Sequence, residues 1–274
     1  MSNLIKLGKF SYINVAPVYY NLEKYLPQNF CIIKEGPPAK LNLALEEENL
    51  DLSPVSAFAY AVNHEKWQLI PDISIGCTKK VISVLLAADL KFEELDNKKI
   101  LLTNESASGA SLLKILFYEK NIYPKFYSGD IHKLDKKEYD AVLVIGDNAL
   151  LIDWEKKFKN VYDLGQSWFE FTNLPFVFGV WAVSKKSYLK NKIKINQIKD
   201  ILHENKKRNL DFSDEMSAIS ANKKNTSKEF MANYFKTIEY DLSEQKIKGL
   251  KLFYSLLFKH KFIKNKVILE FVKG

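Results

Sequence analysis

The stretch Leu4–Pro17, LIKLGKFSYINVAP, carries the pattern that decides the fold. Its first half, Leu4–Phe10, is apolar enough for a buried strand, and Pro17 suits the first turn of a helix, where a missing N–H breaks no hydrogen bond. Ser11 and Asn14 then lie in the turn between strand and helix, where side chains and free N–H groups can meet a ligand. Because ligands of open α/β sheets bind beyond the carboxyl ends of the strands, this turn is a candidate binding site.

Strand and helix patterns alternate along the first two thirds of the chain, which predicts sheets covered by helices. The last expected strand, Phe176–Val183, is continuously apolar, as in a strand buried on both faces. From Lys186 onward, apolar residues recur at helical spacing. We therefore expect a two-lobed α/β fold, each lobe a mixed sheet flanked by helices, with lobe 1 formed by residues 1–88 and 185–274 and lobe 2 by residues 89–184. A ligand would lie in the cleft between the lobes, a common place for pockets.

The formal net charge of +8 is compatible with an anionic partner. The lysines are scattered and alternate with acidic residues in segments typical of solvated surfaces, so a nucleic-acid partner is not expected. Arg208 is the only arginine of the chain. Because bidentate capture of carboxylates usually falls to arginine, a ligand carboxylate would here be held by lysines, hydroxyls, amides or helix N-termini.

Compartment and cofactor can be addressed from the same sequence. No apolar run approaches the ~20 residues of a membrane span, and no export signal is visible, so we expect a cytoplasmic protein. Cys31 and Cys77 are far apart and fit no metal spacing, which favours reduced thiols. The chain has no dinucleotide fingerprint, Walker loop or zinc signature, so neither a nucleotide nor a metal cofactor is expected. The sequence does not indicate an oligomeric state.

A run of hydroxyl and small residues, TNESASGAS at 103–111, joins an expected strand to an expected helix. The run contains Thr103, Ser106, Ser108 and Gly109. Its small residues let a ligand approach the backbone, and its hydroxyls and the first helical N–H groups could hold an anion. A plain helix cap explains the same residues, since Ser and Thr are preferred there.

Three further polar residues accompany expected strands. Ser83 lies in the apolar run Val81–Leu86, either as a tolerated small residue or as a polar group directed into the cleft. Asp147 follows an apolar strand and could act as a general base or cap the next helix, and Ser56 could also cap a helix. No G-x-S-x-G motif is present, and none of the four histidines has a catalytic setting, so we expect all four at the surface.

An ordered series of motifs goes further than these physical arguments. The motifs are Ser11–Asn14 with Pro17, Leu50–Ser56, Pro71–Ile75, Ser83–Leu86, Thr103 with Ser106–Ala107, Leu112–Lys114, Ile145–Leu150, Asp163–Gly165, Trp168, Leu174–Phe178 and Val180–Ala182. The series resembles the chorismate dehydratases of the futalosine route to menaquinone. The resemblance runs from about residue 4 to 184, and the segment Ile238–Phe253 is also similar.

The resemblance implies a fold like the type II periplasmic binding proteins, used as a cytoplasmic enzyme. It implies loss of water from chorismate to give 3-[(1-carboxyvinyl)oxy]benzoate without a cofactor, and it implicates Asn14 and Ser83 in the active site. We expect substrate contacts from Ser11, Ser56, Thr103, Ser106, Ser108, Gly109 and Asp147. The motifs contain no obvious His or Glu base, so the substrate's own enolpyruvyl carboxylate could take the proton while the protein orients it and stabilises developing charge.

Two positions depart from the resemblance. Ile82 stands where relatives tend to have glycine, and this side chain could narrow the pocket. Gly109 stands where a hydroxyl residue is common, which removes one possible donor to a carboxylate.

Three other functions stay open at this level. One is an enzyme of the same pathway that splits a cyclic futalosine product into a dihydroxynaphthoate, although its N-terminal signature differs from S-Y-x-N. The second is a non-catalytic protein that binds a small anion, which would normally carry an export signal. The third is a nucleic-acid-binding protein, for which only the charge argues.

Overall fold

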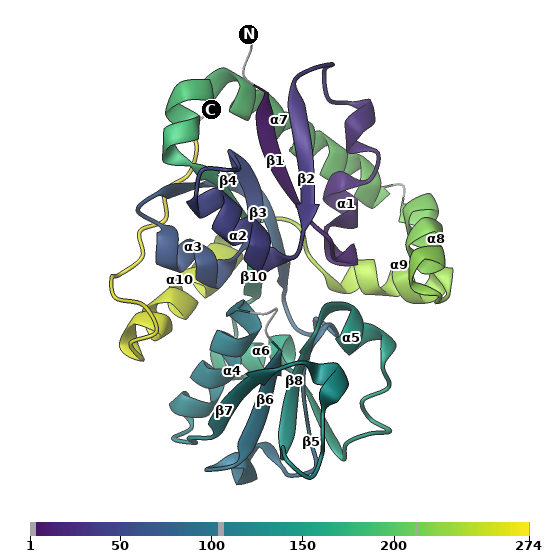
Figure 1. Ribbon diagram of the computed structural model, residues 1–274, viewed down its shortest axis with the longest axis vertical. Helices are drawn as coiled ribbons and strands as arrows, with labels where there is room; N and C mark the ends of the chain where they lie inside the picture. Colours follow the sequence, from purple (N-terminus) through teal and green to yellow (C-terminus); the bar gives the residue numbers. More distant parts are fainter. Residues whose placement is uncertain (1–3, 104–106, 212, 274) are drawn as a thin grey trace. The chain divides into compact units, whose positions relative to one another are not determined.

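The computed structural model describes residues 4–103, 107–211 and 213–273, and the chain divides into two compact units (Figure 1). The first unit contains the chain up to Ile75, Phe178–Ser243 and the chain from Val267 onward. The second unit contains Gly76–Val177 and Glu244–Lys266. The two sheets have five strands each and are flanked by helices, so the expected α/β fold class is confirmed.

The sheet of the first unit has the strand order β2-β1-β3-β10-β4. Its strands are β1 (Ile5–Phe10), β2 (Cys31–Gly36), β3 (Leu52–Ser56), β4 (Trp67–Cys77) and β10 (Phe176–Ser184). β1 runs parallel to β2 and β3, whereas β10 runs antiparallel to β3. Gly8 lets β1 approach β3, because a Cβ at this position would come within 2.1 Å of Ser53 Oγ. The carboxyl ends of β1, β2 and β3 therefore meet at one edge of this sheet.

The helices of the first unit are α1 (Ala16–Tyr19), α2 (Pro38–Glu46), α3 (Ala57–Asn63), α7 (Lys185–Asp211), α8 (Ser213–Lys224) and α9 (Lys228–Thr237), with the 3-10 turns η1 (Ile13–Val15) and η2 (Leu22–Lys24). The sequence pattern predicts one helix over residues 16–25, but the helix ends at Tyr19. Tyr20 is extended and Asn21 is left-handed, with φ 56°. Asparagine visits this conformation more readily than most residues, so a short break is tolerated here.

The sheet of the second unit has the strand order β7-β6-β8-β5-β9. Its strands are β5 (Val84–Ala88), β6 (Lys99–Thr103), β7 (Lys125–Gly129), β8 (Ala141–Ile145) and β9 (Asn160–Asp163). β6 is parallel to β7 and β8, whereas β5 is antiparallel to β8 and β9. The ends of β6, β8 and β9 therefore lie at the same edge as the start of β5.

The helices of the second unit are α4 (Ala107–Glu119), α5 (Gly146–Leu151), α6 (Leu164–Thr172) and α10 (Glu244–Lys259), with the 3-10 turns η3 (Phe92–Leu95) and η4 (Ile131–Lys133). β8 is buried along its whole length. Its residues Val142 and Val144 pack with Trp154 and Phe158 in one hydrophobic cluster. This core fixes β8, whose end leads directly into α5.

The boundaries of the two units differ from the expected lobes of 1–88, 89–184 and 185–274. β5 falls in expected lobe 1, yet every one of its residues pairs with β8, from Val84 opposite Ile145 to Ala88 opposite Ala141. β10 falls in expected lobe 2, yet it pairs with β3 of the first unit. Pairing between strands far apart in the chain sets these boundaries, and a single sequence does not show that pairing.

α10 also belongs to the second unit, although we expected it in lobe 1 with the other C-terminal helices. The ring of Phe253 meets the ring of Phe176 edge-on, with 4.9 Å between their centroids. Lys259 Nζ lies 2.7 Å from Glu119 Oε1 of α4. Contacts of this kind, which the helical pattern does not reveal, decide where α10 packs.

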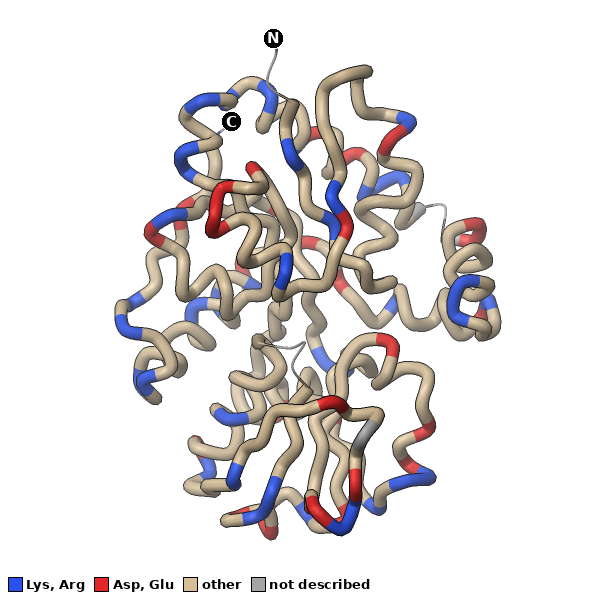
Figure 2. Tube along the Cα trace, viewed as in Figure 1, with Lys and Arg blue, Asp and Glu red and all other residues tan. Residues whose placement is uncertain are grey.

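The surface and the cysteines agree with the sequence analysis. Lysine and arginine are spread along both units and interspersed with acidic residues (Figure 2). Within the described residues, no helix combines the length and apolar character that crossing a membrane requires. Cys31 and Cys77 are free thiols.

The histidines correct one expectation. His132 is exposed, as predicted, but His64 is buried at 7% exposure and His203 is half-buried. His203 lies on the side of α7 that contacts β4, where its Nε2 is 2.8 Å from the carbonyl oxygen of Pro71. A polar partner of this kind lets an imidazole be buried inside a fold, so a polar sequence context did not guarantee exposure.

Candidate active site

Ser11 and Asn14 lie at the carboxyl edge of the first sheet, as the strand-to-helix pattern predicts. The N–H of Ser11 donates to the carbonyl oxygen of Gly36, at the end of β2, over 3.0 Å. Asn14 lies in η1, which follows β1, and Ser56 ends the neighbouring strand β3. The sheet therefore brings three expected site residues to one edge.

The side chain of Asn14 carries a buried acceptor without a donor in the described part of the chain. The residue is half-buried and its Oδ1 is fully buried, yet none of the described residues donates a hydrogen bond to this oxygen. A buried acceptor without a hydrogen bond costs on the order of 1–3 kcal/mol. Because an unsatisfied group of this kind calls for a specific explanation, Asn14 Oδ1 is a candidate contact for a donor on a ligand.

A chain of hydrogen bonds fastens α1 to the sheet beside this turn. The hydroxyl of Tyr19 donates to the carbonyl oxygen of Gly8 over 2.7 Å. The indole N–H of Trp181, on β10, donates to the Tyr19 hydroxyl over 3.0 Å. All of this lies in the buried core, where Tyr19 is 4% exposed and Trp181 is fully buried. These buried hydrogen bonds therefore hold the helix that follows Asn14 against strands β1 and β10.

Two asparagines of α7 complete the end of α1. The Asn205 amide donates to the carbonyl oxygens of Val18 and Tyr20 over 2.9 and 3.0 Å. The Asn209 amide donates to those of Pro17 and Tyr20 over 2.9 and 3.0 Å. A helix of four residues leaves its last carbonyls without partners inside the helix, so these amides supply what the short helix lacks.

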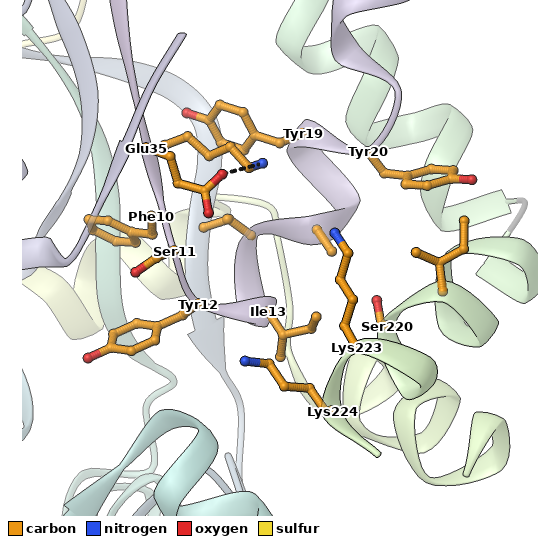
Figure 3. Close-up of a pocket in the computed structure, with 14 residues that line it drawn as sticks. Phe10, Ser11, Tyr12, Ile13, Tyr19, Tyr20, Glu35, Ser220, Lys223 and Lys224 are labelled. Atoms are coloured by element: carbon orange, nitrogen blue, oxygen red, sulfur yellow. Dashed lines mark ion pairs between the residues drawn. The ribbon is translucent and has the colours of Figure 1, made fainter. Parts of the chain in front are cut away.

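A pocket of about 380 Å³ opens beside the same turn (Figure 3). Ser11 and its neighbours line it, and Lys223 and Lys224 extend toward it from α8. Lys9 also lines the pocket, with its Nζ 2.9 Å from Glu35 Oε2. Three lysines against one glutamate leave the lining positively charged, which suits an anionic ligand.

Arg208 takes no part in this pocket lining. Its guanidinium carbon lies 3.8 Å from the centroid of the Tyr25 ring, and its Nη1 donates to Asn205 Oδ1 over 3.2 Å. The pocket lining contains lysines and hydroxyls that could meet a carboxylate, and the expectation that such groups hold a ligand carboxylate stays a prediction.

Ser56 caps α3, because its Oγ accepts the N–H of Ala59 over 3.0 Å. The capping interpretation of this residue is confirmed. The Ser56 hydroxyl can still donate its hydrogen, and a contact with substrate through this hydrogen stays a prediction.

The second sheet gathers another group of expected residues at one edge. Thr103 ends β6, Ser83 immediately precedes β5, and Asp147 follows β8. Because β5 is antiparallel to β8, the start of β5 lies beside the end of β8. Ser83 and Thr103 are only 5% and 9% exposed. We call this group the polar edge of the second sheet.

The first turn of α4 follows β6 at this edge. Ser108 and Gly109 lie in that turn and both are buried. Ser106 lies outside the residues that the structure describes. α4 has 13 residues, and the N-terminal end of such a helix favours negative charge. This environment is compatible with a carboxylate.

Asp147 does not cap α5, which corrects the capping interpretation. The N-cap of α5 is Ile145, and Gly146 follows with a left-handed φ of 56°. Asp147 therefore lies in the first turn of α5, two positions beyond the N-cap. The N–H of Gly146 also donates to the carbonyl oxygen of Ser83 over 2.8 Å, so Ser83 and Asp147 are held close to one another.

Ile82, which precedes Ser83, has a left-handed backbone with φ 53°. This conformation is rare for a β-branched residue, and glycine adopts it without a steric penalty. The glycine expected at this position in relatives therefore has a conformational reason. The N–H of Ile82 donates to Asp163 Oδ2 over 2.7 Å.

Asp163 is a residue of this edge that our sequence analysis did not single out, although it appears in one of the motifs. Besides Ile82, its carboxylate accepts the N–H groups of Val81 over 3.0 Å, Gly165 over 2.9 Å and Gln166 over 3.1 Å. Burial raises the pKa of the Asp163 carboxyl above its ordinary value, and these N–H donors oppose that rise. The ionised carboxylate is the form that can accept all of these bonds.

The family model for menaquinone biosynthesis matches residues 5–259. The chain belongs to the menaquinone biosynthesis family. The family membership expected from the motifs is confirmed. Among the relatives, the chorismate dehydratase of Thermus thermophilus is 29% identical over 264 residues, which cover 90% of this chain and 93% of that protein. The chorismate dehydratase of Campylobacter jejuni is 30% identical over 192 residues, which cover 68% and 71%.

Several solved structures with low sequence identity to this chain have a similar fold. A crystal structure of an Archaeoglobus fulgidus protein has a TM-score of 0.76 at 17% identity and covers 96% of this chain and 99% of that one. The periplasmic aliphatic sulphonate binding protein of Escherichia coli has a TM-score of 0.68 at 14% identity and covers 100% and 95%. A Candida albicans protein with the generic periplasmic binding protein fold has a TM-score of 0.62 at 13% identity and covers 99% of each. The expected binding-protein-like fold is confirmed.

Proposed function

We propose that this protein is a chorismate dehydratase, which converts chorismate to 3-[(1-carboxyvinyl)oxy]benzoate and water. The observation that carries the proposal is the similarity to the Thermus thermophilus chorismate dehydratase, which extends over 90% of this chain and 93% of that enzyme. The motif series along the chain points to the same activity. The location proposed with it is the cytoplasm, which cell fractionation can test.

The reaction is an elimination. The C–O bond to the ring hydroxyl and one ring C–H bond break, and the ring becomes aromatic, which drives the reaction forward. The hydroxyl leaves with the proton as water, so atoms balance and no electrons enter or leave. The reaction therefore needs no redox cofactor, and the acceptor proposed for the proton is the substrate's own enolpyruvyl carboxylate. The protein's task is orientation and hydrogen bonding to developing charge.

Asn14 and Ser83 are the residues that we propose for this polar work. The buried Asn14 Oδ1 has no donor among the described residues, and a hydroxyl of chorismate would supply one. The Ser83 hydroxyl can donate to an oxygen that gains charge. Ser108 and Gly109, in the first turn of α4, would contact a carboxylate.

The test is incubation of the purified protein with chorismate, with the product identified by chromatography and mass spectrometry. Stoichiometric 3-[(1-carboxyvinyl)oxy]benzoate supports the proposal, and the same rate after treatment with a chelator supports a metal-free reaction. Binding of chorismate without turnover would favour a binding protein. Release of a dihydroxynaphthoate from the cyclic futalosine product would favour the other enzyme of the pathway.

Substitution Ser83→Ala tests the role of the hydroxyl. We expect kcat to fall about 10-fold or more, because the variant lacks a donor to developing charge. The KM should change less, and the thermal midpoint should stay close to that of the parent, since one small buried hydroxyl is removed. Turnover at the parental rate would remove Ser83 from the catalytic residues.

A further inference from the structure

We propose that Asp163 is a positioning residue whose carboxylate holds the left-handed backbone of Ile82 and thereby places Ser83 at the polar edge of the second sheet. The kinetic part of this inference rests on the proposed function. Its structural part does not, because it uses only hydrogen bonds and backbone conformation, and all the groups involved lie within the second unit.

The two oxygens of the Asp163 carboxylate share one donor, the N–H of Val81, which lies 3.2 Å from Oδ1 and 3.0 Å from Oδ2, and otherwise have different partners. Oδ1 accepts the N–H groups of Gly165 and Gln166 over 2.9 and 3.1 Å and so caps α6. Oδ2 accepts the N–H groups of Val81 and Ile82 over 3.0 and 2.7 Å. One side chain therefore joins the start of a helix to the two residues that precede Ser83.

The segment that Asp163 holds is strained. Ile82 has φ 53°, a conformation that a β-branched residue keeps only when its surroundings impose it. The bond from the Ile82 N–H is the shortest that the carboxylate makes, at 2.7 Å. On the far side of the strained residue, the Ser83 carbonyl oxygen accepts the N–H of Gly146 over 2.8 Å. Ser83 is thus held from both sides, and Asp163 supplies one of them.

The packing around Gly165 keeps the carboxylate in place. A Cβ at Gly165 would come within 2.5 Å of both Cys77 Sγ and the Lys79 carbonyl oxygen. The absence of a side chain lets the start of α6 lie against the segment that leads to Val81. The motif Asp163–Gly165 can be explained in this way: the aspartate accepts the hydrogen bonds, and the glycine allows close packing against Cys77 and Lys79.

The test compares Asp163→Asn alone and combined with Ile82→Gly. Asparagine keeps one carbonyl oxygen and is a good N-cap, so it can still cap α6. It replaces the other oxygen with an NH₂ group, which cannot accept the Ile82 N–H. We expect kcat for chorismate to fall about 10- to 100-fold in Asp163→Asn, with a smaller change in KM.

Ile82→Gly should rescue the asparagine variant. Glycine adopts a left-handed φ without a hydrogen bond to the Asp163 carboxylate, so the double variant should recover kcat to within about 3-fold of Ile82→Gly alone. Asp130→Asn is the matched control, because Asp130 is also an N-cap aspartate of the second unit, with its Oδ1 accepting the His132 N–H over 3.0 Å. This control should retain the parental kcat.

The outcomes separate the inference from the proposed function. If Asp163→Asn keeps the parental kcat, or if Ile82→Gly brings no recovery, Asp163 does not act through Ile82. If the parent protein does not turn over chorismate, the proposed function fails. The positioning of Ile82 by Asp163 is then tested by thermal midpoints. Asp163→Asn should then lower the thermal midpoint clearly less in the Ile82→Gly variant than in the parent protein. An equal decrease of the midpoint in both proteins would overturn the inference.

Discussion

Asn14 is a residue at which the requirements of folding and of function diverge. Its buried Oδ1 has no donor among the described residues, so the folded protein bears a desolvation cost at this position. Asn42 of α2 has the same feature, because its Oδ1 is also buried and lacks a donor within the described part of the chain. The two asparagines differ in place: only Asn14 lies in the strand-to-helix turn at the edge of the first sheet.

Asn14→Ala should therefore separate stability from activity. We expect the thermal midpoint to stay equal or rise, because an unsatisfied buried acceptor is removed, while kcat for chorismate falls about 10-fold or more. Asn42→Ala is the control and should leave kcat unchanged with a similar effect on stability. Calorimetry and steady-state kinetics measure the two quantities. A parental kcat in Asn14→Ala would contradict the role assigned to this residue.

Ile82 shows a limit of pattern reading at the same scale. The apolar run from Val81 predicts an unbroken strand, but β5 begins only at Val84. The left-handed φ of Ile82 interrupts the strand, at a cost of roughly 1–2 kcal/mol for a residue that is not glycine. The pattern could not show this, because the groups that impose the conformation belong to Asp163, about 80 residues away in the chain.

At the scale of elements, α7 both covers the first sheet and completes α1. The half-buried His203 of α7 contacts the carbonyl oxygen of Pro71, on β4. Burial lowers the pKa of His203, Lys206 and Lys199 lower it further, and the Pro71 carbonyl and the Asp72 carboxylate act in the opposite direction. The folded protein therefore prefers this imidazole neutral.

The stability of the protein should reflect this preference. As the pH falls through the ordinary histidine value of 6.5, the unfolded chain takes up the proton before the folded protein does, so the free energy of unfolding decreases. His203→Gln should weaken this decrease between about pH 7.5 and 5.5. Chemical denaturation at several pH values measures the effect. An unchanged pH dependence in His203→Gln would contradict it.

At the scale of the whole molecule, the chain builds each unit from separate segments. The second unit combines Gly76–Val177 with Glu244–Lys266, and α10 enters it by close packing. Gly249 of α10 lies against Pro175, where a Cβ would come within 2.1 Å of the carbonyl oxygen. The missing side chain is what lets the helix approach this closely.

Gly249→Ala should destabilise the protein, although alanine normally favours a helix interior over glycine by about 1 kcal/mol. The added methyl group meets a backbone atom, and overpacking of this kind typically costs about 1–3 kcal/mol. Gly36→Ala is the control, since its Cβ would meet Leu41 at an ordinary distance of 3.6 Å. Thermal unfolding of both variants tests this, and equal midpoints would contradict the packing argument.

The fold class and part of the candidate site could be predicted from the sequence because they depend on local patterns. Apolar runs and helical spacing predicted the strands and most helices, and the turn after Phe10 was predicted at the edge of the first sheet. The capping of α3 by Ser56 was also predicted, because caps lie within a few residues of their partners. The assignments that failed, the lobe boundaries and the cap at Asp147, depend on which distant segments pair and on one left-handed glycine.

By itself, the amino-acid sequence determined that this is a two-sheet α/β protein with a polar turn at Ser11–Asn14, and its motifs determined the family. These features follow from periodicity and from short segments whose physics is local. Only the tertiary structure decided that α10 belongs to the second unit, that α7 completes α1 and that Asp163 holds Ile82. The physical reason is that these contacts join residues remote in the chain, where packing and hydrogen bonding outweigh local preference.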